Sequence, residues 1–340
     1  MEKGPEIRII GNAPTEKKEQ ARKNIEECLF NHFDSLSLEE RKELEKFEYP
    51  KSQKEIALIN FANGETNKLM EEAGVKPYDI PEKNYHIVPP ELYKKIGGNS
   101  TARTFPTKQG IVFNAQNFRN NPVNFGSVVI HETLHLKAHL TLEVGGDTDK
   151  PSTTHYREGV SVKALQKHGY HGQYHQHFAG LHEAIVAMQQ KKLTAKLLDL
   201  PELAKEKEWL MSDEARAMRE KLAKENDMPE DDIIWIEKDG KDDWETIQYL
   251  PHRKVLEYIC SETQKQFPDQ YQNTDGVFKE FLKAHFTGRL LPISRLVEKT
   301  FGEGGFRMLG NMATSEESGI LHLESLKKMR QKITNARTTR

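Results

Sequence analysis

A helix that must be buried and yet polar on one face is the strongest constraint in this 340-residue chain. The apolar run Val128-Val129-Ile130 leads directly into His131-Glu132-Thr133-Leu134-His135. An uncharged, β-branched run of this kind suits a helix that passes through the middle of a domain. Positions i and i+4 lie on one helix face, about 6 Å apart along the axis, so both imidazoles can reach one cation. The segment therefore predicts a buried helix that carries a metal site.

The residue types favour zinc and hydrolytic chemistry. We expect His131 and His135 to be two Zn²⁺ ligands, because a catalytic zinc site uses three protein ligands and keeps one position open for water. Glu132 follows the first ligand and would take a proton from that water and pass it to the leaving amine. The motif alone is not decisive, since composition produces it by chance in about one such sequence in twenty. The alternative interpretation is a surface helix with an incidental histidine pair.

A third zinc ligand has to come from elsewhere in the chain. His139 would lie about 12 Å from His131 along the helix, too far to share one ion with it. Glu183 stands in a stretch of small and apolar residues that predicts a helix, and we favour it. Glu158 is the alternative third ligand, or otherwise a charge at the rim of the site. It precedes Gly159-Val160-Ser161-Val162, which alternates like an edge strand but could also begin a helix.

Two strings together resemble a known family. Ile130-His131-Glu132-Thr133-Leu134-His135-Leu136, followed by Gly180-Leu181-His182-Glu183-Ala184-Ile185, is similar to the gluzincin metallopeptidases, and most to the small bacterial minigluzincin-like members. The resemblance covers about residues 80–195 and implies a zincin-like fold, peptide-bond hydrolysis and Glu183 as third ligand. The chain departs from many relatives at His182, where they have Asn, and at Val186. The metzincin pattern is disfavoured, because Ala138 and Thr141 replace its Gly and His.

The predicted fold class is α+β. We expect a zincin-like core at residues 80–200, with a small mixed sheet and the active-site helix, between a helical segment at 1–79 and a helical domain at 201–340. Gly110–Asn114 is predicted to be the cleft strand that pairs with the substrate backbone. The basic tail from Lys327 is expected to be frayed. The sequence further predicts helices at 15–47 (broken near 34–37), 53–73, 250–266, 277–286 and 293–301, and strands at 7–10, 84–88 and 233–236.

Histidines are concentrated between the two expected ligand helices, at His155, His168, His171, His175, His177 and His182. We favour a polar loop that covers the cleft as a lid. A second metal site and an electrophilic histidine near the scissile carbonyl are the alternatives. Tyr156, Tyr170 and Tyr174 are equal candidates for polarising the tetrahedral oxyanion.

The composition limits the partners. With 50 Lys and Arg against 52 Asp and Glu, the chain gives no reason to expect nucleic acid or a membrane surface as partner. Two distant cysteines exclude a disulfide framework and predict free thiols. The absence of an apolar signal core or a long apolar run predicts a cytoplasmic protein.

The predicted function is a zinc metallopeptidase that hydrolyses a peptide or protein substrate with a metal-activated water. A catalytically inactive zinc-binding module and a helical interaction protein are the alternatives. The same water activation would also serve a non-peptide amide hydrolase.

Overall fold

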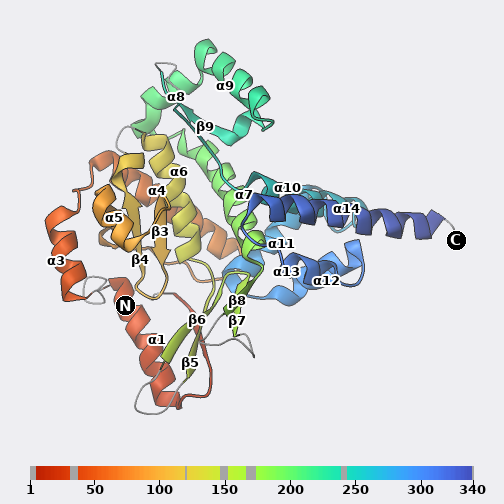
Figure 1. The fold of residues 1–340 in the computed structure, drawn as a ribbon, viewed down its shortest axis with the longest axis horizontal. Coiled ribbons are helices and arrows are strands. Elements are labelled where there is room, and N and C mark those ends of the chain that lie inside the picture. The colour runs from red at the N-terminus through yellow and green to blue at the C-terminus, as the bar shows by residue number, and fades with distance from the viewer. Residues whose placement is uncertain are drawn as a thin grey trace.

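A computed structural model describes residues 5–30, 37–118, 121–145, 152–165, 174–238 and 243–338. Over these residues the fold is α+β, with three small sheets among the helices (Figure 1). The helices are α1 (Thr15–Phe30), α3 (Leu38–Phe47), α4 (Gln53–Glu72), α5 (Pro90–Ile96), α6 (Pro122–Leu136), α7 (Ala179–Leu197), α8 (Ala204–Leu210), α9 (Asp213–Glu225), α10 (Leu250–Gln266), α11 (Thr274–Thr287), α12 (Leu290–Phe301), α13 (Gly305–Gly310) and α14 (Glu316–Thr338). The strands are β1 (Ile7–Ile10), β2 (Tyr85–Val88), β3 (Ala102–Phe105), β4 (Gly110–Asn114), β5 (Leu140–Gly145), β6 (Ser152–Glu158), β7 (Ser161–Leu165), β8 (Tyr174–His177), β9 (Ile233–Ile236) and β10 (Trp244–Thr246).

The three-stranded sheet has the order β2-β4-β3, in which β2 runs parallel to β4 and β3 runs antiparallel to it. The predicted role of Gly110–Asn114 as the cleft strand is therefore wrong. Both edges of this strand are already hydrogen-bonded, so its backbone cannot pair with a substrate. The open edge beside α6 is β3. Strand β2 falls within the predicted strand at 84–88, but its parallel pairing with β4 is not visible in the sequence.

The five-stranded sheet has the order β1-β5-β6-β7-β8, and only the β1–β5 pair is parallel. The described histidines of the histidine-rich span lie in strands β6 and β8 or, in the case of His182, in helix α7, and the lid-loop prediction is wrong for them. Residues 166–173, with His168, Tyr170 and His171, lie outside the described residues. The alternation after Glu158 is that of a strand, because Ser161–Leu165 pairs on both sides.

Helices α4, α6, α7 and α10 form the centre of the molecule (Figure 1). The largest apolar cluster draws on residues from all three predicted ranges, including Leu58, Val129, Ile185, Leu256 and Phe281. Helices α6 and α7 approach closely at Gly126, where a Cβ atom would lie 2.5 Å from Leu197 Cδ2. A larger side chain at Gly126 would push apart the two helices that carry the expected ligands.

Most predicted helices are present with nearly the expected bounds. The start of α4 is a capping box in which the Ser52 hydroxyl accepts from the Glu55 amide and the Glu55 carboxylate accepts from the Ser52 amide. The prediction of a frayed tail from Lys327 is wrong, because α14 continues to Thr338 and Arg330 donates to Glu262 Oε2 and Thr300 O. No helix among the described residues has the length and hydropathy that a bilayer crossing requires.

Candidate metal centre

Helix α6 brings His131, Glu132 and His135 into the middle of the molecule. Its first turn is fixed by Pro122 at N1 and by the Asn121 side chain, which accepts from the Asn124 amide. The helix ends at Leu136, and His139 therefore falls outside it and bonds Thr141 through Nε2.

Helix α7 supplies Glu183 opposite the two histidines. The helix starts after Phe178, whose backbone has a φ of 60° and whose amide donates to Gly310 O. Glu183 Oε2 lies 3.6 Å from His131 Nε2 and 3.4 Å from His135 Nε2, and the two nitrogens lie 3.1 Å apart. The structure thus brings all three predicted ligands together, and they form one of two groups in the described residues that could hold a metal ion.

The spacing of these three atoms matches a tetrahedral zinc site. Ligand bonds of about 2.0–2.1 Å place neighbouring donor atoms about 3.3–3.4 Å apart. The three separations of 3.1, 3.4 and 3.6 Å lie on either side of that value. Glu183 Oε2 is also buried without a hydrogen-bond partner among the described residues. An ionised buried oxygen of this kind is expected to have a cation or donor beside it.

The hydrogen bonds of Gln190 determine which ring nitrogen of His131 carries the proton. The Gln190 amide nitrogen donates to Ser127 O, so its carbonyl Oε1 faces His131 Nδ1 at a distance of 3.0 Å. A carbonyl oxygen only accepts, and His131 Nδ1 therefore carries the proton. The lone pair of His131 Nε2 is left facing Glu183 and His135, as a metal ligand requires.

Glu158 lies on the other side of the His135 ring from Glu183. Its Oε1 accepts from His135 Nδ1 at 3.0 Å, at the end of strand β6. Burial opposes charge here, but the carboxylates of Glu183 and Glu158 raise the pKa of His135 well above its usual value. Burial is likewise outweighed at Glu158 and Glu183, where the neighbouring histidines lower the carboxyl pKa well below its usual value. The two glutamates thus contact different nitrogens of one imidazole.

Glu132 contacts the edge strand of the three-stranded sheet. Its Oε2 accepts from Thr104 Oγ1 at 2.6 Å, and Thr104 belongs to β3. Glu132 is buried, with 9% of its surface exposed. The carboxylate therefore lies between the histidine helix and the open edge of the sheet.

Tyr249 is a site residue that the sequence did not indicate. Its ring stacks on His131, with centroids 6.3 Å apart and planes 9° apart, and its backbone has a φ of 61° just before α10. Burial raises the pKa of its hydroxyl, and the charges of Glu183 and Glu132 raise it further. Of the three tyrosines predicted from the sequence, Tyr156 is a half-buried residue of β6. Tyr170 and the side chain of Tyr174 are outside the part of the chain that the structure describes. The one local feature that distinguishes Tyr249 is its positive φ just before α10, and a backbone angle cannot be read from the sequence.

His285 of α11 supports the site from behind. Its Nε2 donates to Leu134 O in α6, and its ring stacks on His182 with centroids 5.2 Å apart. Burial lowers the pKa of His285 well below its usual value, and the neighbouring His182 lowers it further. The imidazole is therefore neutral and acts as a packing and hydrogen-bonding group.

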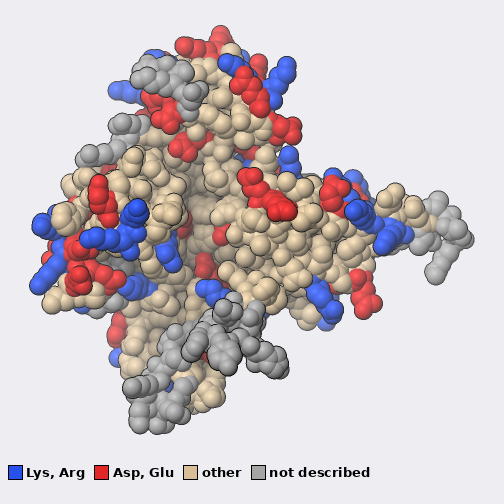
Figure 2. Space-filling view, viewed as in Figure 1, with Lys and Arg blue, Asp and Glu red and all other residues tan. Residues whose placement is uncertain are grey.

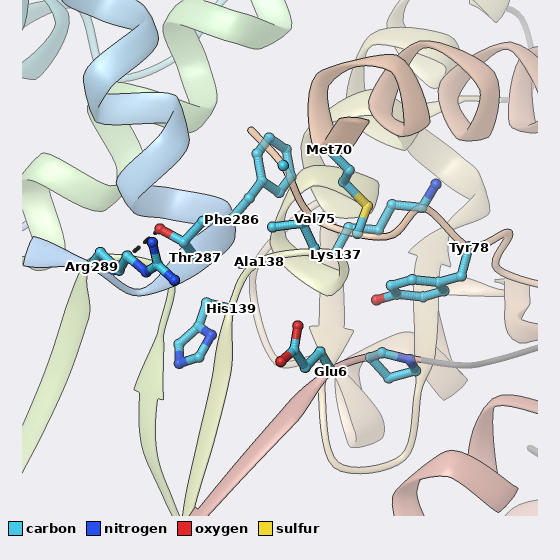
Figure 3. Close-up of a pocket in the computed structure, with 12 residues that line it drawn as sticks. Glu6, Met70, Val75, Tyr78, Lys137, Ala138, His139, Phe286, Thr287 and Arg289 are labelled. Carbon is cyan, nitrogen blue, oxygen red and sulfur yellow. Dashed lines mark hydrogen bonds between the residues drawn. The ribbon is translucent and has the colours of Figure 1, made fainter. Parts of the chain in front are cut away.

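The surface is hollowed over the central helices, between the part that contains α5 and the part that contains α10, and acidic side chains line part of the hollow (Figure 2). A separate pocket of about 130 Å³ opens beyond the end of α6, lined in part by Tyr78, Lys137, His139 and Arg289 (Figure 3). Lys137 Nζ donates to Asn63 O, and burial lowers its pKa to about 7. This pocket contains none of His131, His135 and Glu183.

Comparison with protein-family models, curated proteins and solved structures finds no match to this chain.

Proposed function

We propose that this protein is a zinc-dependent metallopeptidase with a zincin-like core. The observation that carries the proposal is the cluster of His131 Nε2, His135 Nε2 and Glu183 Oε2, whose separations of 3.1–3.6 Å match three corners of a tetrahedral zinc site. Bound there, zinc would polarise the scissile carbonyl and acidify a water molecule. Glu158, the alternative third ligand, would then position His135 through its Nδ1–H.

Glu132 is the proposed general base. Its carboxylate would accept a proton from the attacking water and deliver that proton to the leaving nitrogen. The hydrogen bond from Thr104 fixes one carboxylate oxygen and leaves the other to accept the proton. Gln190 and Glu158 would keep the two histidine rings in the orientation that the site needs.

Two further parts of the cleft have roles in this proposal. Tyr249, stacked on His131, would donate a hydrogen bond from its hydroxyl to the developing oxyanion, because its raised pKa keeps the hydroxyl protonated. Strand β3 would pair with the backbone of a peptide substrate, because it is the edge of its sheet and lies beside Glu132. A peptide or protein is therefore the proposed substrate.

The proposal is tested with Glu132→Gln beside Glu91→Gln, an exposed glutamate of α5 as the matched control. Purified wild type should contain zinc and hydrolyse members of a peptide library. Glu132→Gln should retain zinc and lose activity about 10²- to 10⁴-fold, the usual contribution of a general base. Full activity in Glu132→Gln, or a wild type that binds no zinc, would refute the proposal. Zinc binding without hydrolysis of any peptide would instead indicate a zinc-binding module.

A further inference from the structure

The second nitrogen of His135 belongs to a second cluster of donor atoms. His135 Nδ1 lies 3.0 Å from Glu158 Oε1 and 3.0 Å from His182 Nε2, and the latter two atoms lie 3.6 Å apart. The three residues come from α6, β6 and α7, and they form the second group in the described residues that could hold a metal ion. These separations are again close to the distance of about 3.3–3.4 Å between neighbouring donor atoms of a tetrahedral zinc site.

The tautomer of His182 decides whether its Nε2 can bind a metal ion. The Glu158 carboxylate accepts a proton from His135 Nδ1, so a proton on His182 Nε2 would set two N–H groups against each other at 3.0 Å. With the proton on His182 Nδ1, the lone pair of Nε2 faces His135 and Glu158. A metal ligand needs a free lone pair of this kind.

A further histidine faces the same carboxylate. His155 Nε2 lies 3.7 Å from Glu158 Oε2 and is buried without a hydrogen-bond partner among the described residues. A β-bulge explains why these two side chains meet. In the pairing of β5 with β6, Thr141 is opposite Arg157 and Leu142 is opposite His155, so Tyr156 is an extra residue. The bulge brings His155 and Glu158 to one face of the strand, whereas regular alternation would separate them.

We propose that these residues form a second transition-metal site. His135 Nδ1, His182 Nε2 and a Glu158 oxygen would bind one divalent ion such as zinc. Imidazole and carboxylate donors suit zinc and its neighbours among the divalent ions. With the first site filled, His135 would bridge the two ions as an imidazolate, and its Nδ1 proton would leave to solvent. This site goes beyond the proposed peptidase activity and shares His135 and Glu158 with it.

The test is zinc binding to the full chain after removal of metal with a chelator, counted by elemental analysis after gel filtration. We expect two zinc ions per chain in the wild type and one each in His182→Asn and in Glu183→Gln. Glu158→Gln, which keeps the shape of the side chain, should also bind one and serves as the second variant if His182→Asn does not fold. At pH 8 the second equivalent should release one proton, measured with a pH indicator. Release of no proton would overturn the bridge.

The control removes a different histidine pair. His175 and His177 on β8 have ring centroids 4.5 Å apart, and His175 is exposed, so this pair could bind zinc adventitiously. The double variant His175→Ala/His177→Ala should still bind two ions, and a loss of one would overturn the second site. A single equivalent in the wild type, removed by Glu183→Gln and kept by His182→Asn, would also overturn it and leave the peptidase proposal intact. No bound zinc at all would refute both.

Discussion

Replacing Glu183 and Glu158 by glutamine, one at a time, should separate the metal ligand from the positioning residue. Both changes keep the side-chain shape and remove one charge. Structural zinc binds with about 10–16 kcal/mol over four ligands, so one ligand contributes roughly 3–4 kcal/mol, or about 10²- to 10³-fold in affinity. Glu183 lies 3.4 Å from His135 Nε2, so Glu183→Gln should lower the zinc affinity of the first site by this amount. Glu158 contacts the opposite nitrogen, so Glu158→Gln should lower the affinity of that site only about 10- to 100-fold, as the loss of an outer hydrogen-bond partner does.

The assay is competition for zinc against a chromophoric chelator of known affinity, at one pH and ionic strength. In a His182→Asn background only the first site remains, so the competition reports that site, and Glu91→Gln is again the matched control. Glu183→Gln should weaken zinc binding there more than Glu158→Gln does. The reverse order would make Glu158 the third ligand and refute the assignment drawn from the two ring nitrogens.

Three further predictions concern stability. Gly159→Ala should lower the free energy of unfolding by about 2–4 kcal/mol, because the residue has a φ of +53° and a Cβ would lie 2.7 Å from an imidazole carbon; urea denaturation without a loss of this order would contradict it. Arg253→Met should cost about 3 kcal/mol, because Arg253 binds Asp232 at 2.6 Å in the core; adding Asp232→Leu should recover much of the loss in a double-mutant cycle. The pKa of Lys137 is lowered from 10.5 to about 7 in the folded state, so charging this side chain destabilises the fold. The free energy of unfolding should therefore rise between pH 7 and pH 10, by at most about 1.4 kcal/mol per pH unit. Urea denaturation of Lys137→Met across this range should show no such rise.

The sequence predicted those features that depend on neighbouring residues. The start of α4 depends on Ser52 and Glu55, and α10 has the predicted bounds because Pro251 and a regular apolar pattern are local signals. The pairing of His131 with His135 on one helix face was equally predictable. These interactions connect residues only a few positions apart, and the sequence displays them directly.

Features that depend on distant residues could not be predicted in this way. The parallel pairing of β2 with β4 makes β4 a central strand, and no local pattern shows it. The choice between Glu183 and Glu158 stayed open because local patterns do not tell which imidazole nitrogen each carboxylate faces. Tyr249 meets His131 only because the chain returns to α6 after more than a hundred residues.

The support that His285 gives to Leu134 has a consequence for synthesis. These residues are 151 positions apart, and the ring of Tyr249 also reaches α6 from the C-terminal part of the chain. A chain folding as it leaves the ribosome exposes His131 and His135 long before α11 is made. The nascent protein thus has its motif but lacks the walls of the site until α10 and α11 have been made. For the proposed peptidase, this order would keep the centre incomplete, and hence inactive, during that part of synthesis.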